Sequence, residues 1–303
     1  GGVFPALMAA EEAIKENSLP LNLKFLFEGE EEIGSPTLKS LLESHRDLFA
    51  CNLVLSVDGG MYSNEVPSIT MGCRGLAAIQ IDVLGPHTDV HSGGHGGVIN
   101  NPIQALAAIL CSMKDQDGRI TVEGFYDDVA YVSEEERRKI AEAPFDQDEY
   151  MKRLGVPDLF GEPEFTPLER MWIRPTLDPN GIWGGFQGEG VKTIIPARAS
   201  CKITCRLVPN QDPESIATAL KAHVMKHAPR GVRVNVTTFP GNSKPYVIPD
   251  DHQALPVVAS VLEQLYGKEP IPVRLGGTLP IARAFLDILD TYLFFFAMSG
   301  PDS

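Results

Sequence analysis

Two different strand patterns occur in this chain, and together they constrain its fold more than any other feature. Residues 53–57 form a short apolar run, as expected for a strand covered on both faces of a parallel sheet. Residues 77–84 alternate instead, with Ile79, Ile81 and Val83 on one side and Gln80 and Asp82 on the other. Such alternation is typical of a sheet with one buried face. We therefore predict an α/β domain interrupted by an α+β domain.

The order of the remaining elements supports this division. The pattern predicts helices at 5–16, after Ser35 and Pro36, at 102–113, 213–227 and 254–266, with one short helix before the last strand. It predicts strands at 21–27, 53–57, 77–84, 120–122, 200–208, 232–238, 270–275 and 291–298. Between residues 77 and 238 the order is β-α-β followed by β-α-β, which is typical of a ferredoxin-like sandwich. An acidic insertion rich in proline and glycine occupies 124–190, with one N-cap pair, Ser133 and Glu136.

Composition excludes several classes of function. The chain has 303 residues and a net charge of −14, whereas nucleic-acid binding needs clustered Lys and Arg. The longest apolar run, 292–298, is far shorter than the roughly 20 residues that cross a bilayer. We therefore expect neither nucleic acid nor membrane as a partner. The five cysteines form no C-x-x-C pair and are expected to be free thiols, with Cys201 and Cys205 on the core face of their strand.

The strongest chemical signal is an acidic turn at residues 27–35. Glu28, Glu30, Glu31 and Glu32 follow a predicted strand, at the edge where α/β sheets place their sites. Adjacent carboxylates repel one another unless a cation neutralises them, and a metal ion would do so. A solvated acidic turn at a helix N-terminus is an equally good interpretation of these residues alone. Asp58 follows the next strand, and by itself it reads as an ordinary Asp-Gly turn.

Taken together and in their order along the chain, these segments resemble those of a known superfamily. Residues 31–35, Glu-Glu-Ile-Gly-Ser, with Asp58 at the next strand end, are similar to the metal-site motif of the zinc-dependent dipeptidase and deacylase metallopeptidases. A second block, at 174–176, 190–196 and 205–210, resembles the lid domain of cytosolic nonspecific dipeptidases and carnosinases. The likeness covers essentially the whole chain.

This resemblance implies a fold and an activity. The fold would be α/β, with a three-layer catalytic domain like that of the zinc exopeptidases (residues 1–75 and 244–303) interrupted by an α+β ferredoxin-like lid and dimerisation domain (residues 76–243). The activity would be metal-dependent hydrolysis of dipeptides or very short peptides with a free carboxylate. The resemblance also implies two zinc ions or manganese, a short-peptide substrate, a cytoplasmic location and a homodimer formed through the lid.

Residue roles follow from the same resemblance. Glu31 matches the general base, and Glu32 and Asp58 match metal ligands. His91 matches a lid histidine that polarises the scissile carbonyl from the partner subunit, and Thr193 matches a substrate contact from that lid. Two further matches are to substrate-binding groups. Arg206 matches an arginine that binds substrate, and the loop of Gly276, Gly277 and Thr278 matches a loop near the substrate carboxylate.

Two histidine series invite a metal interpretation that the sequence disfavours. His87, His91 and His95 are spaced by four, but the glycines around them oppose a stable helix. His223 and His227 are also spaced by four, and they flank an apolar helical stripe, so packing or surface placement is the better reading.

The superfamily also uses a His-x-Asp pair, a bridging Asp and a final His that fall outside residues 1–303. We therefore expect a fragment that is inactive by itself. An N-acyl amino acid deacylase and a non-catalytic dimerising fragment remain the alternatives.

Overall fold

The computed structural model describes residues 2–296, and these fold into two compact units. One unit comprises 74–132 and 145–245, and we call it the lid unit. The other comprises 1–73, 133–144 and 246–303, and we call it the catalytic-side unit. The segment 133–144 lies inside the stretch predicted as lid, yet it packs with the catalytic-side unit, because the Tyr62 hydroxyl donates to the Pro144 carbonyl at 2.7 Å and Glu136 pairs with Arg274.

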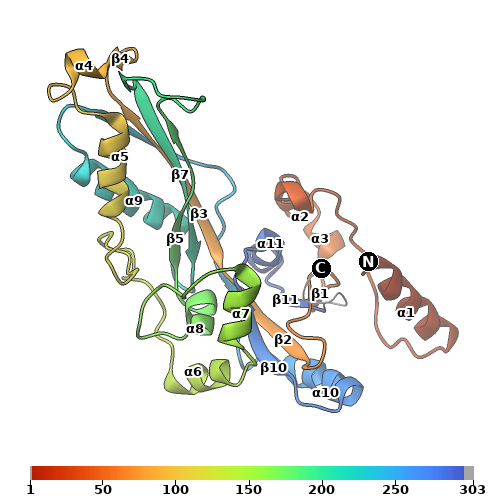
Figure 1. Ribbon diagram of the computed structural model, residues 1–303. Helices are drawn as coiled ribbons and strands as arrows, with labels where there is room; N and C mark the ends of the chain where they lie inside the picture. Colours follow the sequence, from red (N-terminus) through yellow and green to blue (C-terminus); the bar gives the residue numbers. More distant parts are fainter. Residues whose placement is uncertain (1, 297–303) are drawn as a thin grey trace. The chain divides into compact units, whose positions relative to one another are not determined.

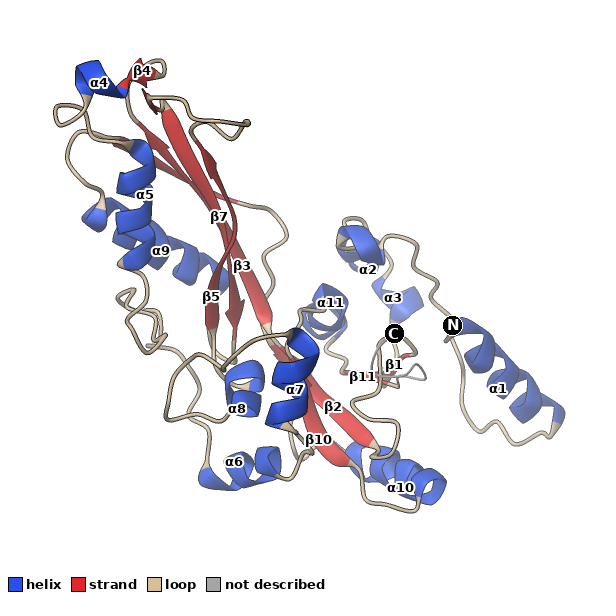
Figure 2. Cartoon of the chain, viewed as in Figure 1, coloured by secondary structure: helices blue, strands red, loops and turns tan. Residues whose placement is uncertain are grey.

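A four-stranded antiparallel sheet forms the lid unit (Figure 1). Its strand order is β5 (Thr176–Gly184), β7 (Arg198–Leu207), β3 (Gly75–Leu84) and β8 (Arg233–Thr238). Helices α5 (Pro102–Cys111) and α9 (Pro213–His227) pack on one face, as Figure 2 also shows. Chain order and sheet order together are those of a ferredoxin-like sandwich, so the predicted class is confirmed.

Alternation along the strands explains which face the helices cover. Ile79, Ile81, Ile203 and the thiols of Cys201 and Cys205 point to the helices and are fully buried. The cysteines are all free, as predicted. Residues at the intervening positions form the other face of the sheet, which we call the open face, because neither α5 nor α9 packs there.

Smaller elements complete the lid unit. β4 (Val90–His91) pairs with β6 (Ile194–Ile195), and α4 (Ser92–His95) follows β4. Helices α7 (Gln147–Leu154) and α8 (Pro167–Trp172) belong to the insertion. The helical turn α4 corrects the expectation that glycines forbid helix there; one turn forms because the His91 side chain caps it by accepting from the Gly93 N–H.

The catalytic-side unit holds two small sheets. β1 (Val54–Ser56) pairs in parallel with β11 (Leu293–Phe295), while β2 (Ser68–Cys73) lies between parallel β10 (Ile271–Leu275) and antiparallel β9 (Tyr246–Val247). The helices of this unit are α1 (Val3–Lys15), α2 (Leu38–Ser44), α3 (Arg46–Phe49), α6 (Glu134–Ala141), α10 (Leu255–Tyr266) and α11 (Pro280–Leu289), with the 3-10 turn η1 (Glu31–Ile33). The predicted end of the last strand, 297–298, lies outside the described residues.

Two predicted strands are absent from the described residues, and five strands of the structure were not predicted, namely β2, β4, β5, β6 and β9. Residues 21–27 pair with no strand in the range 2–296, so their backbone groups lack the partner that a strand needs. Residues 120–122 make only one bridge, from Ile120 to Lys114, and the Ile120 N–H donates to the Tyr126 hydroxyl. The longest of the missed strands is β5, whose Pro179 and Gly181 read as a loop but sit at a register shift on the sheet edge, where they are tolerated.

Candidate active site

The acidic turn is the first part of the candidate site. Glu31 and Glu32 begin η1, which ends at Gly34 with a left-handed backbone (φ 84°). The Glu30 carboxylate accepts from the Thr37 hydroxyl at 2.5 Å and from the Thr37 N–H at 3.2 Å. These bonds fix the turn against the start of α2, so Glu30 has a structural role that the sequence did not separate from its neighbours.

Electrostatics distinguish Glu31 within this turn. Partial burial, followed by the negative charges of Glu32, Asp58 and Glu28, raises the pKa of Glu31. The charges of Glu32, Asp58 and Glu28 therefore act on Glu31, and the place of Asp58 in the site stays a prediction. Within residues 2–296, Glu28 Oε1 is buried and accepts no hydrogen bond.

These features fit a bound cation, which would satisfy the carboxylates and reverse their repulsion. The donor set is small, however. Among the residues that the structure describes, no three His, Cys, Asp or Glu side chains are grouped so that they could hold a metal ion. Glu32 and Asp58 accordingly stay predicted ligands, and they supply two carboxylates rather than a full coordination shell.

His91 and Thr193 are brought together at one end of the lid unit. The Thr193 Oγ1 lies 3.3 Å from His91 Nε2, although the residues are 102 positions apart. The Gly93 N–H donates to His91 Nδ1 at 3.0 Å. In a neutral ring the proton is then on Nε2, which is the tautomer that can donate to a developing oxyanion.

Arg206 lies at the other end of the lid unit, on β7. It is directly opposite Leu76 on β3 and Thr176 on β5, and it is half-buried on the open face. The His91 end adjoins Leu84, because Leu84 pairs with Arg198 and the Gly85 N–H donates to the Ala197 carbonyl. Eight residues separate Leu76 from Leu84 on β3, which is about 27 Å at 3.4 Å per residue.

The loop of Gly276, Gly277 and Thr278 joins β10 to α11 in the catalytic-side unit. The parallel pairing of β10 with β2 shifts register between Val273 and Arg274, just before this loop. Arg274 is mostly buried and forms an ion pair with Glu136 of α6. The segment 133–144 thus braces the strand that leads into the loop, a contact that sequence reasoning missed.

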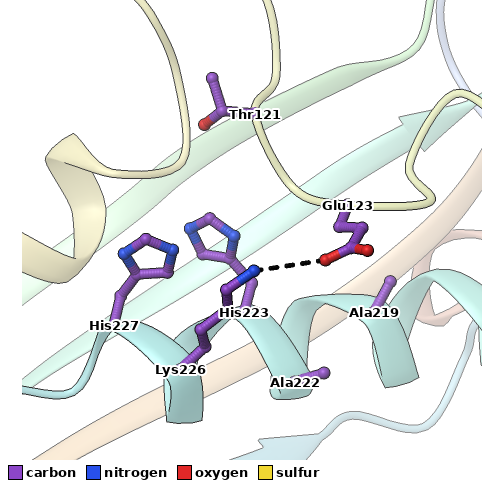
Figure 3. Close-up of a pocket in the computed structure, with 7 residues that line it drawn as sticks. All are labelled: Thr121, Glu123, Ala219, Ala222, His223, Lys226 and His227. Atoms are coloured by element: carbon purple, nitrogen blue, oxygen red, sulfur yellow. Dashed lines mark hydrogen bonds and ion pairs between the residues drawn. The ribbon is translucent and has the colours of Figure 1, made fainter.

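His223 and His227 line a pocket on α9 (Figure 3). Its volume is about 190 Å³, and its other lining residues are Thr121, Glu123, Ala219, Ala222 and Lys226. The imidazole rings stack with centroids 4.2 Å apart, and His223 Nε2 is 3.0 Å from Ser112 Oγ. Burial first, and then the charge of His227, lowers the pKa of His223. His223 is therefore a packed core histidine, as the sequence indicated.

The described residues thus combine a ferredoxin-like lid unit with an α/β unit that carries an acidic turn. The profile of the "Peptidase dimerisation domain" of the M20 peptidases matches residues 71–232, and the chain belongs to this family. No described helix is long and apolar enough to cross a membrane.

Individual relatives agree with this assignment. The chain is 31% identical to the human Beta-Ala-His dipeptidase, over 90% of this chain and 55% of that protein. It is 30% identical to the Cys-Gly metallodipeptidase of Schizosaccharomyces pombe, over 97% and 63%. The solved structure of the dipeptidase Dug1p of Saccharomyces cerevisiae superposes with a TM-score of 0.82 at 27% identity, over 99% of this chain and 64% of that chain. The chain therefore spans 55–64% of the length of these relatives.

Proposed function

We propose that the whole protein is a metal-dependent dipeptidase that hydrolyses dipeptides or very short peptides with a free carboxylate. The observation that carries this proposal is the effect of the negative charges of Glu32, Asp58 and Glu28 on Glu31, in a chain whose relatives are named metallodipeptidases. Two zinc ions, or manganese, held in part by Glu32 and Asp58, would lower the pKa of a water molecule so that it can attack the peptide carbonyl.

The chain's own residues then handle the proton and the substrate. The raised pKa of Glu31 lies closer to neutral pH than that of an ordinary glutamate. Glu31 takes the proton of the attacking water and delivers it to the leaving amine. His91 donates from Nε2 to the oxyanion that forms on the scissile carbonyl. Arg206 and the loop of Gly276, Gly277 and Thr278 hold the substrate carboxylate, which restricts the enzyme to short peptides.

The length of the lid sheet supports a homodimer with shared active sites. An extended dipeptide spans about 7 Å, whereas His91 and Arg206 lie near opposite ends of β3, which is about 27 Å long between Leu76 and Leu84. One lid therefore cannot bring both residues to one dipeptide. We propose that His91 and Thr193 act on a substrate held by Arg206 of a second copy.

Subunit mixing tests this arrangement. His91→Ala protein mixed with Glu31→Gln protein should regain activity, because one site of each hybrid combines both defects and the other combines neither. The expected recovery is up to a quarter of wild-type activity after random mixing. Failure to recover activity in verified hybrids would mean that each subunit works alone.

Substrate choice tests the reaction itself. Comparison of turnover on dipeptides and on N-acetyl amino acids separates a dipeptidase from a deacylase, since the proposal requires faster cleavage of dipeptides.

A further inference from the structure

A row of three residues crosses the open face of the lid sheet at the end where β3 begins. Leu76, Arg206 and Thr176 are directly opposite one another on β3, β7 and β5. Directly opposed residues of antiparallel strands point to the same face. The next row, Ala77, Cys205 and Leu177, is buried against the helices, so the side chains of Arg206 and Thr176 project together on the open face.

Arg74 places a second guanidinium at this end of the sheet. Its Nη1 donates to the carbonyl of Arg174 at 3.5 Å, two residues before Thr176. That carbonyl is held in place because the Arg174 side chain forms a two-point ion pair with Glu162, at 2.5 and 2.9 Å. Burial first, and then the positive charge of Arg206, lowers the pKa of Arg74 to about 10, and the negative charge of Asp178 offsets part of this shift. Arg74 and Arg206 are therefore close enough to repel each other.

Thr176 adds a hydroxyl that the protein leaves unsatisfied. Its Oγ1 is buried and has no hydrogen-bond partner within residues 2–296. A buried hydroxyl without a partner destabilises the fold, and each such group in a native structure calls for an explanation. The neighbouring acid, Asp178, is exposed and lies 3.4 Å from the ammonium of Lys114.

We propose that Arg74 and Thr176 join Arg206 to form a binding site for the terminal carboxylate of the substrate. An anion placed here offsets the repulsion between the two guanidinium groups, and it accepts the hydrogen bond that Thr176 does not make within the lid. The inference rests on the proposed function and extends it, because it assigns two further specificity-determining residues.

Thr176→Val is the most discriminating variant, since valine keeps the shape of the side chain and removes only the hydroxyl. The melting temperature should stay the same or rise, because an unsatisfied buried group is lost. KM for a dipeptide should rise by about three- to tenfold with little change in kcat. The matched control is Thr204→Val, a neighbour on the same face of β7, which should leave KM unchanged. An unchanged KM for Thr176→Val would overturn the role of Thr176.

Arg74→Gln tests the second guanidinium. KM for the dipeptide should rise by about ten- to a hundredfold, while KM for the C-terminal amide of the same dipeptide should hardly change. Arg74→Lys should restore part of the loss, because it returns the charge without the fork geometry. Equal losses on acid and amide would show that Arg74 only supports the fold, and would overturn its role in binding.

The result for this carboxylate site can be separated from the result for the proposed dipeptidase function. Absence of dipeptide turnover by the wild-type protein would reject the proposed function. Calorimetric binding of the dipeptide in a Glu31→Gln background measures the same effects of Thr176→Val and Arg74→Gln without turnover. Unchanged affinity there, in a protein that does cleave dipeptides, would reject this inference alone.

Discussion

The lid unit and the catalytic-side unit differ in how completely they bury their apolar side chains. In the lid unit, every inward position of β3 from Ala77 to Val83 is fully buried. In the catalytic-side unit, α1 has no buried residue, and Phe4 and Leu21 are 71% and 67% exposed. The stripe Val257, Val261 and Leu265 on α10 is also exposed. A sheet covered by two helices can stabilise itself, whereas scattered short strands leave much apolar surface in water.

The acidic turn, which carries the predicted chemistry, therefore lies in the unit that buries its apolar side chains less completely. The carboxylates lie on a short turn of the catalytic-side unit, while His91 and Arg206 lie on strands β4 and β7 of the lid. Groups on strands are held more precisely than groups on loops, so the lid is suited to positioning and the acidic turn to a bound cation. Substitutions in each unit can test this division between positioning by the lid and chemistry at the acidic turn.

Glu31→Gln should cause the largest loss. Removal of the general base is expected to lower kcat by about a thousandfold, while bound zinc stays near the wild-type amount. The matched control is Glu30→Gln, because Glu30 accepts hydrogen bonds from Thr37 and should lose little activity. Steady-state kinetics and metal analysis check both. Loss of the metal together with activity in Glu31→Gln would mean that base and ligand roles are shared.

Paired core substitutions compare the stability of the two units. Ile81→Ala in the buried centre of β3 should lower the free energy of unfolding of the lid by about 3 kcal/mol. Ile14→Ala on the exposed face of α1 should change stability by less than about 0.5 kcal/mol. Denaturant unfolding of each variant gives the values. A large cost for Ile14→Ala would show that this face of α1 is buried in the whole protein, and the contrast between the units would disappear.

A pH series gives the smallest expected effect. Because burial lowers the pKa of His223 below its unfolded value of about 6.5, the unfolded lid binds a proton that the folded lid resists. Lid stability should therefore be full above pH ~6.5 and decline as pH falls through that value toward the lowered pKa.

His223→Leu should remove this decline, whereas His227→Gln should retain part of it, since burial is the larger cause of the shift. Thermal unfolding measured between pH 5 and 8 checks the slope. A decline that persists unchanged in His223→Leu would assign it to other groups.

Much of the lid could be predicted from the sequence, because the patterns that indicate its strands and helices span only a few consecutive residues. The alternation at 77–84 and 200–208 placed the buried faces of β3 and β7, including Cys201 and Cys205. Helix α9 spans 213–227, as its apolar stripe and Pro213 indicated. In the candidate site, strand order predicted that Asp58 lies near Glu31. The charge of Asp58 contributes to the raised pKa of Glu31, although residues 21–27 before the acidic turn pair with no described strand.

The remaining features depend on contacts between distant residues, which periodicity cannot register. Residues 21–27 alternate like a strand, yet no described strand pairs with them. β5 contains Pro179 and Gly181, and only its place at the edge of the sheet makes it a strand. The brace of Arg274 by Glu136 joins residues 138 positions apart.

The two-domain class, the buried faces of the lid strands and the family are all legible in the sequence. Which side chains meet depends on the folded sheet: Thr193 lies beside His91, Thr176 is opposite Arg206, and the charge of Arg206 acts on Arg74. A few consecutive residues show which face of a strand is buried, whereas packing over the whole sheet fixes which residues of two strands lie opposite each other. A slip of one residue in β5 would turn Thr176 to the other face and remove it from the row with Arg206.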